Sequence, residues 1–300
     1  MIYHEMPPLW DRSFRERFYA RWGRESAVIS AATRHAEYPD YTQLLSVKMA
    51  SGGGEDYFVD GRRIRVDDDT FLILNAGRRY GSLISALQPV RSFSVFFRAQ
   101  LAEEVEDAMR RSTEAQLAEP IAERVRPLEF DERLRDHDGT VTPVLRHIQR
   151  VIDAGGGDDG WLEEQLHLLM GRMLRLEGRQ REAHELIASA RPATRRELYR
   201  RIGLGVTFIH THYREPIDLR DIARAAHLSP FHFLRTFKAV HGMTPSAFLK
   251  RKRTAAALRV MRASNWTLTE IAEWVGFGSR ATLFRHLRAA RRLPPECVPG

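Results

Sequence analysis

The sequence predicts an α+β chain of 300 residues, with an N-terminal β-domain followed by helices and then an all-α C-terminal domain. Three observations support this class: short apolar runs between turn residues over 27–98, helical periodicity from about residue 101, and a repeated helix pair in the last hundred residues. Hydrophobic residues make up 43% and charged residues 29%, an ordinary globular composition that excludes a chain disordered throughout.

The region 27–98 predicts many short strands, which is typical of a sandwich or barrel. The expected strands are the apolar or alternating runs at 27–30, 43–47, 63–66, 70–74 and 92–97. The expected turns between them are the clusters at 38–40, 51–54, 60–61 and 75–77. Of these, Asp60-Gly61 predicts a tight hairpin turn, because both residue types tolerate left-handed backbone.

A helix is expected over 161–187, because its apolar residues recur at spacings of 4, 3, 4 and 3. This seam consists of Leu162, Leu166, Leu169, Met173 and Leu176. Two interpretations stay open: a helix that packs on its own β-domain, and a seam between two copies of the chain. The second interpretation makes these five residues a candidate dimer seam.

Charge is distributed unevenly along the chain. Residues 191–300 contain 21 Lys and Arg against 7 Asp and Glu, whereas residues 1–190 contain 26 against 32. A basic domain attached to an acidic one indicates a polyanion-binding module. Because small residues and Pro192 mark a break at the same point, the predicted domains are 1–188 and 197–300, with a linker at 189–196.

An internal repeat occupies the basic region. Residues 218–237 resemble 267–287 at an offset of 49 that becomes 50 after the turn. Each copy opens with a capping signature, Asp218-x-x-Asp221 and Thr267-x-x-Glu270, followed by a short helix, a break and a second helix. The copies therefore predict two helix-turn-helix units.

The second helix of each unit predicts one buried and one exposed face. Phe233 with Phe237, and Leu283 with Leu287, recur at i, i+4 and are expected in the core, which leaves a basic and polar face outside. Such a face suits phosphates and base edges. A helix over 244–263 joins the units and carries the basic run 250–253, and it is long enough to hold two recognition helices about one DNA turn apart, roughly 34 Å.

These residues resemble the AraC/XylS family of transcription regulators over about 198–295. The resemblance rests on Ile222-Ala223, Leu228-Ser229-Pro230, Leu234-Arg235-Thr236-Phe237, Gly242-x-x-Pro245, Arg253-x-x-x-Ala257, Ile271-Ala272-x-x-x-Gly276-Phe277 and Pro295. It implies a homodimeric regulator that binds double-stranded DNA and contacts RNA polymerase. The base-reading positions it implies are Phe231, Leu234, Arg235, Arg280, Ala281, Thr282 and Arg285. The expected phosphate contacts are His232, Lys238, Arg251, Lys252 and Arg288. The closing segment departs from the family pattern at Arg292 and Cys297-Val298.

The N-terminal part resembles the cupin-type sensor domain of this family, and the resemblance implies a cupin-like β-barrel for effector sensing and dimerisation within 1–188. Residues 69–80 are similar to the second cupin motif, but Asn75 replaces the usual proline and Tyr80 the usual histidine ligand. We therefore expect no metal and no cofactor, and a pocket of ordinary side chains for a small-molecule effector. The candidate pocket residues are Tyr57, Arg78 and Tyr80.

Three alternatives remain beside an effector-controlled regulator. The same DNA-binding protein could respond to a protein partner or to its own concentration, or the β-domain could be a cupin enzyme with a nucleic-acid-binding appendage, against which the missing ligands argue. A DNA-repair relative would need more cysteines than Cys297. The sequence shows neither a secretory signal nor an apolar run of about 18 residues, so we expect a cytoplasmic protein that does not enter the membrane.

Overall fold

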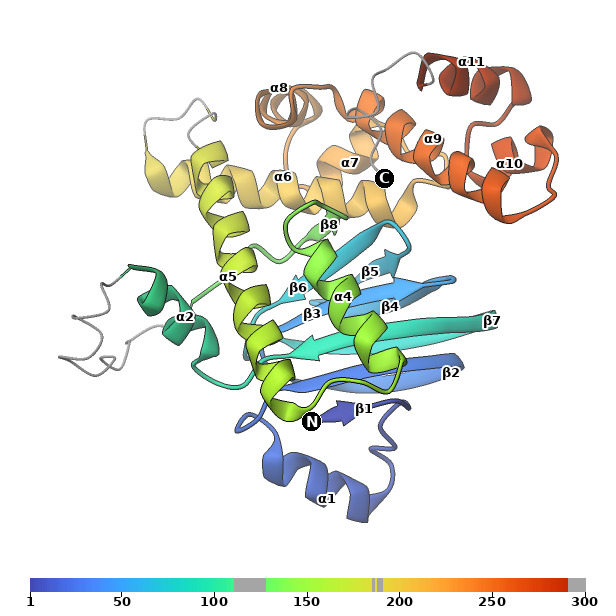
Figure 1. The fold of residues 1–300 in the computed structure, drawn as a ribbon. Helices are drawn as coiled ribbons and strands as arrows, with labels where there is room; N and C mark the ends of the chain where they lie inside the picture. Colours follow the sequence, from blue (N-terminus) through green and yellow to red (C-terminus); the bar gives the residue numbers. More distant parts are fainter. Residues whose placement is uncertain (111–127, 185–186, 188–190, 291–300) are drawn as a thin grey trace. The chain divides into compact units, whose positions relative to one another are not determined.

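The computed structural model describes residues 1–110, 128–184, 187 and 191–290. The chain divides into two compact units, Met1–Arg181 and Glu182–Gly300 (Figure 1). The first unit is a β-sheet followed by helices, and the described part of the second contains only helices, so the α+β class is confirmed. Within the described ranges, no helix is both long and apolar enough to cross a membrane.

The first unit is built on one eight-stranded sheet. Its strands are β1 (Ile2–Tyr3), β2 (Ala27–Thr42), β3 (Ser46–Ser51), β4 (Gly54–Val59), β5 (Arg62–Asp67), β6 (Thr70–Leu74), β7 (Arg79–Phe96) and β8 (Leu134–Asp136). The order is β1-β2-β7-β3-β6-β8, with β4 paired to both β5 and β7. The helices within its described residues are α1 (Arg12–Arg21), α2 (Leu101–Arg110), α4 (Thr142–Asp153) and α5 (Asp159–His184).

The two longest strands let the sheet fold over on itself. The first part of β7 pairs with β4 and its last part with β3, while β2 accompanies it on the other edge. Ala50 and Leu72 from one half pack in the same buried cluster as Tyr57 and Ile64 from the other. The described pairings do not join the two ends of the strand path, and they give a folded sheet with an enclosed interior.

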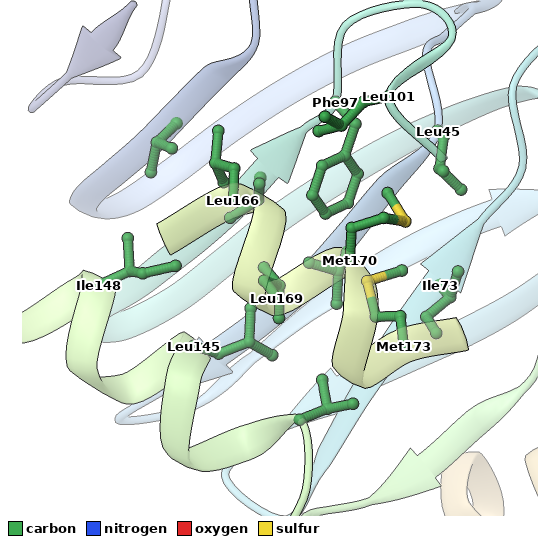
Figure 2. Packing of buried hydrophobic residues seen from close by; sticks show 14 of the residues in the cluster. Leu45, Ile73, Phe97, Leu101, Leu145, Ile148, Leu166, Leu169, Met170 and Met173 are labelled. Atoms are coloured by element: carbon green, nitrogen blue, oxygen red, sulfur yellow. The ribbon is translucent and has the colours of Figure 1, made fainter. Parts of the chain in front are cut away.

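Alternation along the strands divides the side chains between that interior and a helix-covered face. In β3, Val47 and Met49 join the cluster shared with α4 and α5, whereas Lys48 between them is buried on the opposite face, where it lines a cavity. Figure 2 shows the helix-covered face, where Leu145 of α4 and Leu169 of α5 pack against the sheet. One face of the sheet is therefore almost wholly apolar, and the other is mixed.

This packing contradicts the prediction of a dimer seam on α5. Leu162, Leu166, Leu169 and Met173 of α5 are at most 3% exposed and belong to the sheet–helix core, and Leu176 packs against it. Because the seam covers apolar strands of its own unit, it is not free to meet a second copy. The alternative interpretation, a helix packed on its own β-domain, is the one observed.

Two of the predicted turns have different outcomes. Asp60 and Gly61 have φ values of 49° and 72° and connect β4 to β5, so the hairpin turn is confirmed. Tyr38-Pro39-Asp40 lies inside β2, where the register with β7 shifts between Tyr38 and Tyr41. Since proline cannot donate to a ladder, it is accommodated at this irregularity and does not end the strand.

The C-terminal part of the predicted linker is helical. Helix α6 begins at Pro192, so residues 192–196 of the predicted linker are helical. Residues 188–190 lie outside the described part of the chain, as does the closing segment with Arg292 and Cys297. Proline at the first helical position is favourable, because the amide that it lacks would have no partner in the helix.

The second unit contains six helices within its described residues. They are α6 (Pro192–His212), α7 (Leu219–Ala225), α8 (Pro230–His241), α9 (Pro245–Ala263), α10 (Leu268–Trp274) and α11 (Arg280–Ala290). One apolar cluster, which includes Ile209, Phe237, Phe248 and Leu283, draws on helices from both copies of the repeat. The copies are therefore parts of one folded domain.

Candidate functional site

The internal repeat folds into two helix-turn-helix units, α7–α8 and α10–α11, joined through α9 (Figure 1). Both predicted capping boxes are present: Asp218 pairs reciprocally with Asp221, and Thr267 with Glu270. Hydrogen bonding to backbone amides lowers the pKa of Asp218, and hydrogen bonds from Thr267 lower the pKa of Glu270. Each box satisfies amides that the first helical turn leaves unpaired, and so sets where the helix begins.

The second helix of each unit turns its apolar pair inward, as the spacing predicts. Phe233 and Phe237 of α8 are fully buried, and Leu283 and Leu287 of α11 are at most 7% exposed. Phe233 lies against α6, where a Cβ added to Gly205 would approach its ring to 2.5 Å. The opposite faces of α8 and α11 therefore point away from this core.

The base-reading candidates lie on these outer faces to different extents. Those that are exposed are Phe231, Arg235, Arg280, Ala281 and Arg285. Leu234 is half-buried, and so is Thr282, whose Oγ1 accepts a hydrogen bond from Ser279 Oγ at 2.9 Å. The Thr282 hydroxyl is therefore partly occupied at the start of its own helix.

Most phosphate candidates are accessible, and one is not. Lys238, Arg251 and Arg288 are exposed and His232 is half-buried, whereas Lys252 is 5% exposed, with its Nζ 5.3 Å from the centre of the Tyr213 ring. Lys252 is therefore corrected to an interior residue, since successive residues of a helix point in different directions and only part of a basic run can face solvent.

Two residues of the second unit carry roles that the sequence analysis did not assign. Phe284 is 55% exposed on α11, next to Arg285, and so presents an aromatic ring on the outer face. The sequence could have revealed this exposure, because Phe284 directly follows Leu283, which belongs to the buried i, i+4 pair. Arg253 instead secures the fold: its guanidinium donates to the carbonyl oxygens of Tyr213 at 2.6 Å and Glu215 at 2.7 Å, at the end of α6.

A cavity of about 50 Å³ lies in the first unit, on the inner side of the folded sheet. Tyr57 and Tyr80, two of the three candidate pocket residues, line it. Arg78 does not: it is half-buried and pairs with Glu132 and, at 3.2 Å, with Asp60. The Arg78 side chain is thus held by acids outside the cavity.

The cavity contains charged groups that the sequence analysis missed. Lys48 and Glu55 are 2% and 3% exposed and both line it. Burial lowers the pKa of the Lys48 ammonium to about 7, although the Glu55 carboxylate acts in the opposite direction. Burial likewise raises the pKa of the Tyr57 hydroxyl well above its usual value. The sequence signal that could have revealed Lys48 is its position between two apolar residues, Val47 and Met49.

Comparison with known proteins places only the C-terminal unit. Residues 222–298 match the model of a family described as a helix-turn-helix domain. Regulatory protein PocR of Salmonella typhimurium is 27% identical over 89 residues, which are 30% of this chain and 29% of PocR. A putative AraC-like transcription regulator of Streptomyces lividans is 31% identical over 94 residues, 31% of each chain. The chain thus spans about a third of the length of these relatives.

Similar solved structures include the DNA-binding domain of AdpA in complex with a target DNA, which is 29% identical. That match covers 31% of this chain and 81% of that one, with a TM-score of 0.29. ToxT from Vibrio cholerae is 9% identical, with 90% of this chain and 96% of that one covered and a TM-score of 0.34. The C-terminal unit of this chain therefore contains a helix-turn-helix domain, similar to those of AraC-like transcription regulators over the same region.

Proposed function

We propose that this chain is a sequence-specific DNA-binding transcription regulator, not an enzyme, whose two recognition helices α8 and α11 enter successive major grooves. The observation that carries the proposal is the pair of outer faces with one sign of charge. Arg235 and Lys238 lie on α8, and Arg280, Arg285 and Arg288 on α11, all exposed. Guanidinium groups can pair with both acceptors of a guanine edge, and lysines with phosphates.

The joining helix supports simultaneous binding by both units. Helix α9 has 19 residues, a length of about 28 Å at 1.5 Å per residue. That length is of the order of the roughly 34 Å between successive major grooves on one side of DNA. Exposed Lys250 and Arg251 near its start would then face the phosphates between the two grooves.

The test is a selection of random duplexes by the full-length protein, followed by titration of the selected duplex. Two short motifs about 10 bp apart are expected, one for each helix. With Arg235→Ala or Arg285→Ala, the preference should relax at one motif only. Binding to the random duplexes without enrichment of any motif would contradict sequence-specific recognition.

We further propose that a small molecule bound in the first unit controls the regulator. The support is the cavity, which combines aromatic walls with convergent polar groups, as ligand sites do. Burying Lys48 and Glu55 costs free energy, and apolar residues at these positions would serve a purely structural role at lower cost. Control by a protein partner or by protein concentration would leave the DNA affinity unchanged by every small molecule.

A further inference from the structure

The cavity of the first unit is lined by a buried cation and a buried anion on β3 and β4, two strands that both pair with β7. Lys48 comes from β3 and Glu55 from β4, and both are almost wholly removed from solvent. Aromatic rings of Trp22, Tyr57 and Phe96 line the same space. Since isolated buried charges are costly, the partners of each group decide what the cavity can accept.

Lys48 lies against rings. Its Nζ is 3.5 Å from the centre of the Phe96 ring, 5.5 Å from that of Tyr80 and 6.0 Å from that of Tyr57. Ring faces attract an ammonium group but cannot accept three hydrogen bonds as water or a carboxylate would. Lys48 can therefore donate to an anionic oxygen in the cavity.

Glu55 is fixed by the sheet but retains acceptor capacity. Ser92 Oγ donates to its Oε2 at 2.7 Å, and the Tyr57 hydroxyl hydrogen-bonds with it as well as with Ser94. A carboxylate has about four acceptor positions, so two remain after these bonds. Those positions suit an N–H donor of a ligand.

A second acceptor lies on the cavity wall. Gln43 is 6% exposed, its backbone is hydrogen-bonded to Gly77 and Arg78, and its Oε1 has no hydrogen-bond partner among the described residues. An unpaired buried amide oxygen costs about 1–3 kcal/mol. The cavity wall therefore offers one cationic hydrogen-bond donor, Lys48, and two acceptors, Glu55 and Gln43.

Charge balance and size restrict the ligand further. A lone carboxylate would leave the cavity with net negative charge beside Glu55, and a lone amine would add a positive charge beside Lys48. A volume of about 50 Å³ admits only a small ligand. From these constraints we infer that the cavity binds the zwitterion of a small amino acid, with its carboxylate on Lys48 and its ammonium on Glu55 and Gln43. This inference rests on the proposed effector control and names the effector class.

The test is calorimetric titration and thermal unfolding of the full-length protein, without DNA, against a matched set of probes. L-alanine carries both groups, propionate lacks the amine, and ethylamine lacks the acid; glycine and β-alanine vary the size and separation. At least one amino acid should bind saturably and raise Tm, since it stabilises only the folded state. Propionate and ethylamine should bind at least tenfold more weakly.

Variants tie the binding to named groups. Lys48→Met, Glu55→Gln and Gln43→Leu should each weaken the amino acid at least tenfold, and Arg78→Met, outside the cavity, should leave it unchanged. Far-UV circular dichroism identifies any variant that fails to fold, and the milder Gln43→Leu keeps the test available. Because Lys48 has a pKa of about 7 and a carboxylate raises it, binding at pH 8 should take up protons, measured as a buffer-dependent enthalpy that is lost in Lys48→Met.

Three results would overturn the inference: propionate that binds as tightly as the tightest amino acid, ethylamine that does so, or no response to any probe. None of these depends on DNA, so they leave the proposed DNA-binding activity intact. Conversely, loss of sequence-selective DNA binding in the selection experiment would not alter the calorimetric result. The two proposals therefore fail separately.

Discussion

The two helix-turn-helix units begin alike and turn differently. Both start with a reciprocal capping box, and both bury an Ile-Ala pair, Ile222-Ala223 and Ile271-Ala272. In the first unit the left-handed turn residue is His227, with φ of 52°, whereas in the second it is Gly276, with φ of 82°. A Cβ at Gly276 would lie 2.6 Å from the carbonyl oxygen of Arg214. The turn therefore tolerates a side chain in the first unit and excludes it in the second.

Each copy is adapted to the part of α6 that it contacts. The second unit packs its turn against the end of α6, where Arg214 also lies 3.5 Å above the Trp274 ring. The first unit instead brings the Phe233 ring onto Gly205, in the middle of α6. The two outer faces differ as well, since α11 carries three exposed arginines and α8 only one. We expect the second unit to depend more on its turn and to contribute more charge to DNA binding.

The largest expected effect is on the second turn. Gly276→Ala should destabilise the C-terminal unit by about 3 kcal/mol, because left-handed backbone strain adds to a backbone clash. Gly278→Ala is the matched control, since Gly278 has φ of 68° and no atom within 4 Å of an added Cβ. Urea unfolding followed by tryptophan fluorescence measures both. Equal losses in the two variants would show that the clash with Arg214 is relieved by a small shift.

Next in size is the loss of one base-reading arginine from each unit. Arg285→Ala and Arg235→Ala should each cost about 1–3 kcal/mol of binding and relax the preference at one base pair. Titration of the selected duplex and of its single-base variants gives the position affected. If either variant weakened all duplexes equally, its arginine would be a phosphate contact.

The helix that joins the units offers a smaller test. Arg251→Ala should weaken binding uniformly and flatten the salt dependence by about one unit, because an exposed cation no longer displaces a counterion. Lys252→Met should leave the salt slope unchanged, since Lys252 is buried against Tyr213. Affinity measured from 50 to 200 mM salt decides this, and a flatter slope for Lys252→Met would return that residue to the interface.

The smallest effect is expected at the first turn. His227→Gly should stabilise the C-terminal unit by about 0.5 kcal/mol, since glycine adopts positive φ without steric cost but loses more entropy on folding. The same urea titration measures it. A clear loss of stability would mean that the exposed imidazole makes a contact that matters more than its backbone.

Local patterns predicted the C-terminal unit well. Capping signatures, the i, i+4 pairs and the break residues depend on neighbours within a few positions, and each of them lies where the repeat indicated. The inward direction of Lys252 could not be predicted, because a run of four basic residues does not reveal which one faces Tyr213. Whether α5 met a sheet or a second copy was likewise undetermined, because a heptad-like seam suits both partners.

The cavity was harder to predict than the fold. Tyr80 was noticed from the likeness of 69–80 to a cupin motif, and Tyr57 was a candidate outside that motif. Lys48 and Glu55 were missed because they come from strands whose pairing through β7 is not local. Arg78 was expected inside and is held outside by Glu132, an acid 54 positions away. Long-range pairing of charges is what a single sequence conceals.

The burial of the α5 seam also defines the smallest part of the N-terminal unit that can exist by itself. A fragment ending near residue 158 would keep every described strand and α4 but lose α5, and so would leave part of the apolar sheet face, to which Val47, Ile73 and Phe93 belong, open to water. Exposed apolar patches of that kind promote association between chains. Helix α5 therefore completes the cover over the apolar face of the sheet, and a fragment without it should self-associate more readily than the whole unit.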